Sequence, residues 1–252
     1  MQLGLVTYQW GAEWDLPTLI KNCEEAGFRG VELRTTHKHG VEPSLSEAQR
    51  VEVVKRFAAS KVELVGLGSI CEFQSPDPAV LKRNIESAKD FVRLCHDIGG
   101  GGVKVRPNGL PKDVPVEQTI RQIGEAIDEV AEFGEGYGVE IRVEVHGKGT
   151  NNVPTFKKIM DVAKNSNAKV CWNCNREDSD PPGLKSNFES LASRLGTVHI
   201  HDLASNYPWP ELFGLLKAAQ FEGWTLLEGE SKVEDPARRM KEYKIAWDAL
   251  AM

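Results

Sequence analysis

Four residues whose side chains can bind a metal ion recur at nearly even spacing in the second half of this chain: Glu144, Asn173, His199 and Glu228. They are separated by 29, 26 and 29 residues. Two carboxylates, an imidazole and an amide oxygen form a mixed nitrogen and oxygen set, which suits Mn²⁺, Co²⁺, Mg²⁺ or Zn²⁺ better than an ion that prefers thiolates. If the four side chains converge, we expect a divalent metal site; the alternative is a hydrogen-bonded or ion-paired polar plug.

The elements that must position these residues are short apolar runs alternating with amphipathic segments. The runs are rich in β-branched residues, and the segments between them carry apolar residues three and four apart, which is typical of helices. The expected strands cover residues 3–8, 30–34, 62–68, 102–107, 139–147, 169–175, 197–203 and 224–230. The clearest helical segments cover residues 16–27, 46–60, 77–99, 116–138 and 154–165.

Eight strand and helix units in 252 residues give about 31 residues per unit, which favours a parallel sheet built by repetition. We therefore predict an α/β fold, a single-domain (β/α)8 barrel over residues 1–252. A doubly wound open sheet is the alternative. It would need fewer strands and usually a glycine-rich turn after the first strand, where this chain has TYQWGAEW (7–14).

Further polar residues lie at the C-terminal ends of the expected strands, which form the catalytic rim in a barrel of this kind. Barrel strands are buried on both faces, so an ionisable residue there costs free energy unless it is paired or binds a ligand. The set comprises Glu32, Lys104, Arg106, His146, Asn175 and His201, together with Glu230 at the end of the eighth strand and Trp10 after the first. We expect substrate-binding residues among them.

The charged rim residues Glu32, Lys104 and Arg106 each have two interpretations. Glu32 could hydrogen-bond a substrate, or form an ion pair inside the barrel with Lys104 or Arg106. The two basic residues could hold an anionic or carbonyl group of a substrate, or neutralise the glutamates.

The uncharged rim residues also have two interpretations each. His146 and His201 could carry protons or support the metal ligands, or be structural histidines. Asn175 could bond a sugar hydroxyl or form a turn. Trp10 could form an apolar wall against a sugar ring or pack beneath the loops.

Composition excludes several classes of protein. The formal net charge is −6 and the basic residues are scattered, so we expect no nucleic-acid partner. No apolar run approaches about 18 residues and no leader-like segment opens the chain, so we expect no membrane association and a cytoplasmic location. The five cysteines form no disulfide pattern, and Cys171 and Cys174 have no second pair to complete a zinc knuckle. A redox pair would open a helix, whereas this C-x-x-C ends an expected strand.

Four motifs carry a resemblance to a known family: GFRGVELR (27–34), VEVHG (143–147), VHIHD (198–202) and LLEGE (226–230). In this order and spacing they resemble the xylose isomerase-like TIM barrels, the sugar phosphate isomerase/epimerase superfamily, and the similarity covers essentially the whole chain. The resemblance implies a divalent metal held by residues from strands five to eight, which correspond to Glu144, Asn173, His199 and Glu228.

Asn173 departs from the family pattern, which places an aspartate there, and Arg176 stands where a histidine is usual. A neutral amide removes about one negative charge from the site and lowers its affinity for a cation. Asn173 could therefore be a weaker ligand, a residue that orients a metal-bound water, or a sign that the metal has been lost.

The resemblance implies a sugar isomerase or epimerase that acts through a cis-enediolate, with Glu144 and Glu228 as catalytic residues and Mn²⁺ as the first expected ion, before Co²⁺, Mg²⁺ or Zn²⁺. The partner would be a small-molecule sugar. Alternatives are a dehydratase or lyase acting on a keto-sugar, keto-inositol or 3-keto-glycoside, a nuclease, and a non-catalytic sugar-binding homologue. Apolar positions in residues 209–224 and 246–252 leave a homo-oligomer open.

Overall fold

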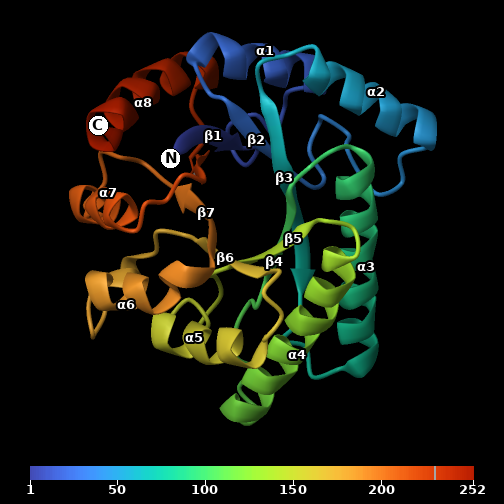
Figure 1. The fold of residues 1–252 in the computed structure, drawn as a ribbon, viewed down its shortest axis with the longest axis vertical. Helices are drawn as coiled ribbons and strands as arrows, with labels where there is room; N and C mark the ends of the chain where they lie inside the picture. Colours follow the sequence, from blue (N-terminus) through green and yellow to red (C-terminus); the bar gives the residue numbers. More distant parts are fainter. Residues whose placement is uncertain (230) are drawn as a thin grey trace.

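The chain folds into a closed ring of eight parallel strands surrounded by helices (Figure 1), as seen in the computed structural model, which describes residues 1–229 and 231–252. Each strand pairs with the next along the chain, and β1 pairs with β8 to close the ring. The strands are β1 (Gln2–Val6), β2 (Gly30–Arg34), β3 (Glu63–Glu72), β4 (Gly102–Arg106), β5 (Glu140–Glu144), β6 (Ala168–Trp172), β7 (Leu195–Ile200) and β8 (Trp224–Glu228). The helices are α1 (Leu16–Ala26), α2 (Glu47–Ala58), α3 (Pro78–Asp97), α4 (Val116–Glu135), α5 (Val153–Val162), α6 (Leu184–Leu191), α7 (Trp209–Ala218) and α8 (Pro236–Ala251).

The predicted (β/α)8 barrel is confirmed, and all eight strands lie where the sequence places them. The five helical segments read from the sequence correspond to α1 to α5, whereas α6, α7 and α8 were not predicted by range. Strands β5 to β8 end two or three residues earlier than expected, so His146, Asn175 and His201 lie in the loops that follow. Glu230 lies outside the described residues.

Local sequence signals explain where several helices begin and end. The Asp15 side chain accepts a hydrogen bond from the Thr18 amide at the start of α1. Gly27 ends this helix with a φ of 77°, a conformation that favours glycine. At α2 the Ser46 and Gln49 side chains bond each other's backbone amides in a capping box. These caps satisfy amide groups that have no partner within the helix.

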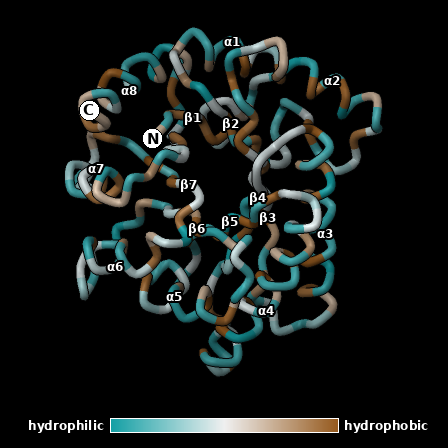
Figure 2. The backbone as a smooth tube through the Cα atoms, in the orientation of Figure 1, coloured by the Kyte–Doolittle hydropathy of each residue, from teal (hydrophilic) through white to brown (hydrophobic). Residues whose placement is uncertain are grey.

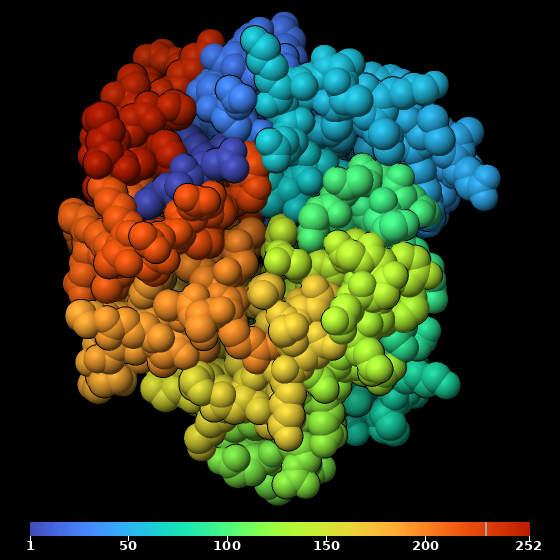
Figure 3. All heavy atoms as spheres, viewed as in Figure 1, coloured from blue at the N-terminus to red at the C-terminus, as the bar shows by residue number. Residues whose placement is uncertain are grey.

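The hydrophobic core lies between the outer faces of the strands and the inner faces of the helices. Figure 2 shows this as hydrophobic colour along the ring and hydrophilic colour over much of the outer surface. The largest fully buried side chains include Trp172, Phe28, Phe73, Phe156 and Phe213. The first and last segments of the chain pack side by side (Figure 3), because β1 pairs with β8 from Gln2 opposite Trp224 to Val6 opposite Glu228.

The inside of the barrel is filled below the strand ends. Val6, Val65 and Leu226 form a small cluster there, with Trp224 packed against it. The Arg142 guanidinium is largely buried and donates a hydrogen bond to the Val65 carbonyl oxygen (2.9 Å). The space that remains for chemistry is therefore at the C-terminal ends of the strands, as in other barrels of this type. None of the described helices combines the length and the apolar composition needed to cross a bilayer.

We expect Gly66→Ala to destabilise the protein by about 1–3 kcal/mol, measured by urea unfolding, because an inserted methyl group overpacks the barrel. A Cβ at this position in β3 would lie 2.2 Å from the Gly102 carbonyl oxygen. The matched control is Gly214→Ala in α7, where a Cβ meets no atom within 4 Å. That substitution should stabilise the protein by roughly 0.5–1 kcal/mol through helix propensity. Equal effects of the two substitutions would contradict the packing argument.

Candidate active site

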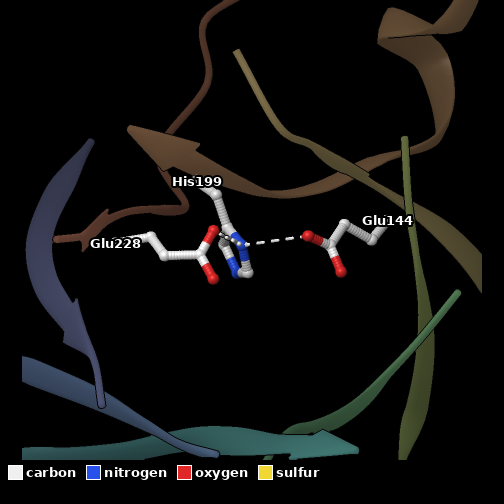
Figure 4. A group of neighbouring side chains, drawn as sticks. All are labelled: Glu144, His199 and Glu228. Carbon is white, nitrogen blue, oxygen red and sulfur yellow. Dashed lines mark ion pairs between the residues drawn. The ribbon is translucent and has the colours of Figure 1, made fainter. Parts of the chain in front are cut away.

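Glu144, His199 and Glu228 converge at the C-terminal ends of β5, β7 and β8. Each offers one ligand atom, and the three atoms lie within 4.8 Å of one another. His199 Nδ1 lies 3.5 Å from Glu228 Oε2 and 4.0 Å from Glu144 Oε1. Figure 4 shows the two carboxylates reaching the imidazole from opposite sides. This is the convergence that the sequence spacing predicts for three of the four residues.

His199 Nδ1 and Asn173 Oδ1 are buried at these strand ends and have no hydrogen-bond partner among the residues that the structure describes. Asn173 follows β6 directly and is 6% exposed. Buried polar atoms are nearly always bonded, so an unpartnered one marks either a cost or the place of a missing ligand. An imidazole nitrogen and an amide oxygen are both metal ligands, and the residues therefore fit a divalent ion.

Glu32 fixes the orientation of the His199 ring from the side away from this cluster. His199 Nε2 lies 3.4 Å from Glu32 Oε1 and 3.5 Å from Oε2, and both side chains are buried. An Nε2 proton directed to Glu32 leaves the Nδ1 lone pair facing Glu144 and Glu228, as in many metal sites where a carboxylate supports a histidine ligand. The expected ion pair of Glu32 with Lys104 or Arg106 is replaced by this contact with His199.

Lys104 pairs with Glu144, with Nζ donating to Oε2 at 2.6 Å. Burial lowers the pKa of Lys104, but the carboxylates of Glu144, Glu32 and Glu228 outweigh it and raise the pKa above its ordinary value. Burial raises the pKa of Glu228, while the His199 imidazole, 3.5 Å away, and the charge of Lys104 lower it, to about 2. Three carboxylates against one ammonium leave a net charge of −2 when His199 is neutral, which suits a divalent cation.

A proton on His199 balances part of this charge when no other cation is bound. Burial disfavours the imidazolium, but Cys171, Glu32 and Glu228 favour it and raise the pKa of His199 well above its ordinary value. Glu32 is affected in the opposite sense. Burial raises its pKa, and the charges of His199 and Lys104 reverse this, so that the pKa of Glu32 lies below its usual range.

The remaining charged and amide rim residues are held by protein partners. Arg106 Nη2 donates to Glu72 Oε1 (2.7 Å), which places this cation beside the end of β3. Asn175 Nδ2 donates to the Val145 carbonyl oxygen (2.6 Å), and its Oδ1 accepts from Asn173 Nδ2 at 3.4 Å. Asn175 therefore orients the Asn173 side chain, a role that the sequence did not suggest.

The two rim histidines and Trp10 are also tied to neighbouring groups. His201 Nε2 lies 2.7 Å from the Asn173 carbonyl oxygen, and its Nδ1 lies 3.3 Å from that of Glu228. His146 Nδ1 lies 3.0 Å from Asn108 Oδ1. The Trp10 indole donates to the Ser231 carbonyl oxygen and is 6% exposed. That these three bind substrate stays a prediction.

Sequence reasoning missed a buried carboxyl beside the site. Tyr207 donates to Asp178 Oδ2 (2.8 Å) and accepts from the Trp172 indole (3.2 Å), which joins the loops after β6 and β7. Burial raises the pKa of Asp178 to about 7. A cavity of about 420 Å³ lies between these loops and is lined by residues that include Cys174, Tyr207 and Trp209. Within REDSD (176–180), nothing in the sequence distinguishes this aspartate from a solvated charge.

A second hollow, of about 590 Å³, lies over the ends of β1 and β2 and the segment after β8. Its lining includes Tyr8, Trp14, Arg34, His37 and Lys232. The Arg34 guanidinium lies 5.0 Å from the centre of the Tyr8 ring, a cation–π distance.

Comparisons with known proteins agree with this fold. The profile of the xylose isomerase-like TIM barrel family matches residues 20–247. Inosose isomerase of Bacillus velezensis is 23% identical over 143 residues, 57% of this chain and 50% of that protein, so the match spans about half the length of this curated relative. D-psicose 3-epimerase from Clostridium cellulolyticum, solved with D-tagatose, has a TM-score of 0.82 at 17% identity and covers 99% of this chain and 98% of its own. IOLI protein, solved with a zinc atom, has a TM-score of 0.85 at 14% identity, with 100% and 98% covered.

We expect Asn173→Asp to tighten Mn²⁺ binding by about tenfold or more, measured by calorimetry, because it adds a negative charge next to the cation. Asn175→Asp adds the same charge two residues further on, at a side chain that bonds Val145 and Asn173. Its effect should be several times smaller. Equal gains in the two variants would mean that the charge acts at long range and that Asn173 is not directed at the ion.

Asp178 should make stability depend on pH. Its carboxyl titrates near its ordinary value of 3.8 in the unfolded chain and near 7 in the folded protein. Between these values the folded state keeps a proton that the unfolded state releases, so stability falls as pH rises from about 4 to about 7. Asp178→Asn should remove this contribution. The free energy of unfolding of the variant, measured with urea, should therefore fall less than that of the wild type as the pH rises across that interval. Asp180→Asn, at an exposed position of the same loop, serves as the control. Its free energy of unfolding should depend on pH in the same way as that of the wild type.

Proposed function

Because the chain belongs to the xylose isomerase-like TIM barrel family, we propose that it is a divalent-metal-dependent isomerase or epimerase of a small sugar or sugar derivative. Its relatives by sequence and by fold include proteins named for such reactions, an inosose isomerase and a D-psicose 3-epimerase.

We propose residues 1–252 as one functional unit. A cytoplasmic location is also proposed, supported by five cysteines that are all free and buried.

The observation that carries the proposal is the placement of two carboxylates on opposite sides of one imidazole whose Nδ1 has no hydrogen-bond partner in the described part of the chain. Glu144, His199 and Glu228 would hold the ion, with Asn173 as a fourth, neutral ligand. Mn²⁺ is the ion we propose first, because the donors are mostly oxygen. A solved structural neighbour holds zinc, which supports a divalent ion at this mouth in general.

A bound divalent cation would polarise the carbonyl of the sugar and stabilise the negative charge of a cis-enediolate. Glu228 would remove the proton from the carbon next to the carbonyl. Glu144, on the other side of His199, would take a proton from solvent and deliver it to the opposite face of that carbon or to its neighbour, and Glu228 would release its proton to solvent. The first outcome is epimerisation and the second is isomerisation.

The rim residues around this cluster would bind the rest of the sugar. We propose Lys104 and Arg106 for carbonyl or anionic groups, and Glu32, Asn175, His146 and His201 for hydroxyl groups or for orienting the ligands. Trp10 would contribute apolar surface. Each of these side chains comes from the C-terminal end of a strand or from the loop that follows it, where barrel enzymes bind their substrates.

A second candidate is an elimination from the same enediolate, as in a dehydratase or lyase acting on a keto-sugar, keto-inositol or 3-keto-glycoside. The observation that favours it is the neutral Asn173 together with Arg176, where the family usually has an aspartate and a histidine. In this reaction Glu228 would again remove the proton, and a group on the next carbon would leave with its electron pair.

The experiment is an assay of Mn²⁺-loaded protein with free ketoses, keto-inositols and 3-keto-glycosides in D₂O, followed by NMR. We expect an epimer or isomer with deuterium on the carbon next to the carbonyl. At saturating Mn²⁺, Glu228→Gln should lower kcat by about 10²–10⁴ because a proton carrier is lost. Glu242→Gln, on exposed α8, should leave kcat unchanged. Release of water or aglycone with no epimer formed would exclude the isomerase and support the elimination.

A further inference from the structure

Lys104 is the one lysine, among the residues that the structure describes, whose side chain is buried. It lies on β4, next to β5, and its ammonium donates to Glu144 Oε2 at 2.6 Å. The two side chains are 4% and 3% exposed. Burying an ammonium costs several kcal/mol unless close negative groups offset it, so Lys104 needs carboxylates close by.

The two oxygens of Glu144 have different neighbours. Oε2 accepts from Lys104, while Oε1 faces His199 Nδ1 at 4.0 Å, on the side where the candidate ligand atoms converge. Glu228 differs, because among the described residues no lysine or arginine lies within ion-pair distance of its carboxylate. The cation on Glu144 therefore makes the two glutamates unequal.

A carboxylate next to a hard cation can bind it through one oxygen or through both. For Glu144 to bind through both, Oε2 would have to leave the Lys104 ammonium. An ammonium held at 2.6 Å from Oε2 competes for that oxygen and holds it away from the ion. It also adds a positive charge near the ion, which lowers the affinity for a cation.

We propose that Lys104 is a positioning residue that limits Glu144 to one oxygen on the metal and lowers the affinity of the site for the ion, while its ammonium holds the other oxygen. The proposal rests on the proposed function for its kinetic consequence, but its effect on metal binding does not require turnover. It assigns to this lysine a task other than the substrate contact expected of a basic rim residue.

The test compares Lys104→Met and Lys104→Arg with the wild type by competition between the protein and a chelator for Mn²⁺. Lys104→Met should bind Mn²⁺ at least about tenfold more tightly, and Lys104→Arg, which keeps the charge, should stay close to the wild type. The matched control is Arg106→Met, which removes a cation two residues along the same strand whose partner is Glu72. It should change the dissociation constant by less than about twofold.

A spectroscopic readout reports coordination directly. The visible absorption of Co²⁺-loaded protein weakens as the coordination number rises, so Lys104→Met should show weaker bands than the wild type and Arg106→Met should not. With substrate, Mn²⁺-saturated Lys104→Met should lose kcat by about tenfold or more with little change in KM. Tighter metal together with slower turnover is a pattern that loss of a structural ion pair would not produce.

Folding is checked by thermal unfolding with and without Mn²⁺. The metal-free Lys104→Met protein should have a lower Tm than the wild type, because Glu144 is left without its cation, and Mn²⁺ should raise its Tm by more than that of the wild type. Lys104→Gln serves as the second neutral variant if the methionine variant does not fold. Unchanged or weaker Mn²⁺ binding in a folded neutral variant would overturn the proposal.

The outcomes separate this inference from the proposed function. Wild-type protein that binds no divalent ion would overturn both. Wild-type protein that binds Mn²⁺ and turns over a sugar, with no gain in affinity in Lys104→Met, would leave the proposed function in place and exclude the role of Lys104. Tighter binding in Lys104→Met without any activity in the wild type would support the role of Lys104 in metal binding and count against the isomerase.

Discussion

Negative charge buried at the mouth of the barrel is the constraint on which the rest of the site depends. Glu32, Glu144 and Glu228 surround one imidazole where little water reaches. Carboxylates this close are stable only beside positive charge. Lys104 supplies one unit, and the remainder can come from a proton on His199 or from a divalent cation. Both arrangements use the same side chains, so the protein can stay folded while the occupant of the site changes.

The closed ring is what allows mutually repelling groups to stay together. Glu144, His199 and Glu228 stand on separate strands, and each strand is held by hydrogen bonds on both sides because β1 pairs with β8. Below them the interior is filled by apolar side chains and by Arg142. The carboxylates therefore cannot move apart by opening the sheet or sink into the barrel. The packed layer of helices and strands provides the burial free energy that offsets their repulsion.

The sequence was sufficient for the fold and for the convergence of Glu144, His199 and Glu228, because one strand and one helix per unit bring residues about 30 apart to the same level. It could not assign their partners. Whether Glu32 meets His199 or a lysine depends on the stagger between strands, which shifts in register between Val31 and Glu32. The positions of helices α6 to α8 depend more on packing against the barrel than on the spacing of apolar residues in the sequence. The Asp178–Tyr207 contact joins two loops that no periodicity relates.

Asn173 and Lys104 are best understood together. Asn173 adds no negative charge where the family usually has an aspartate, and Lys104 adds a positive charge. Each residue therefore makes the site less negative. With a divalent ion bound and His199 neutral, the charges of the group would cancel. In the proposed reaction Glu228 would become neutral when it takes the proton, and its negative charge would move to the oxygens of the sugar. An aspartate in place of Asn173 would oppose that charge at close range, whereas a neutral amide does not. In the proposed reaction an amide here would weaken the resting metal site and lower the electrostatic cost of the intermediate, and such a difference between ground state and transition state favours catalysis.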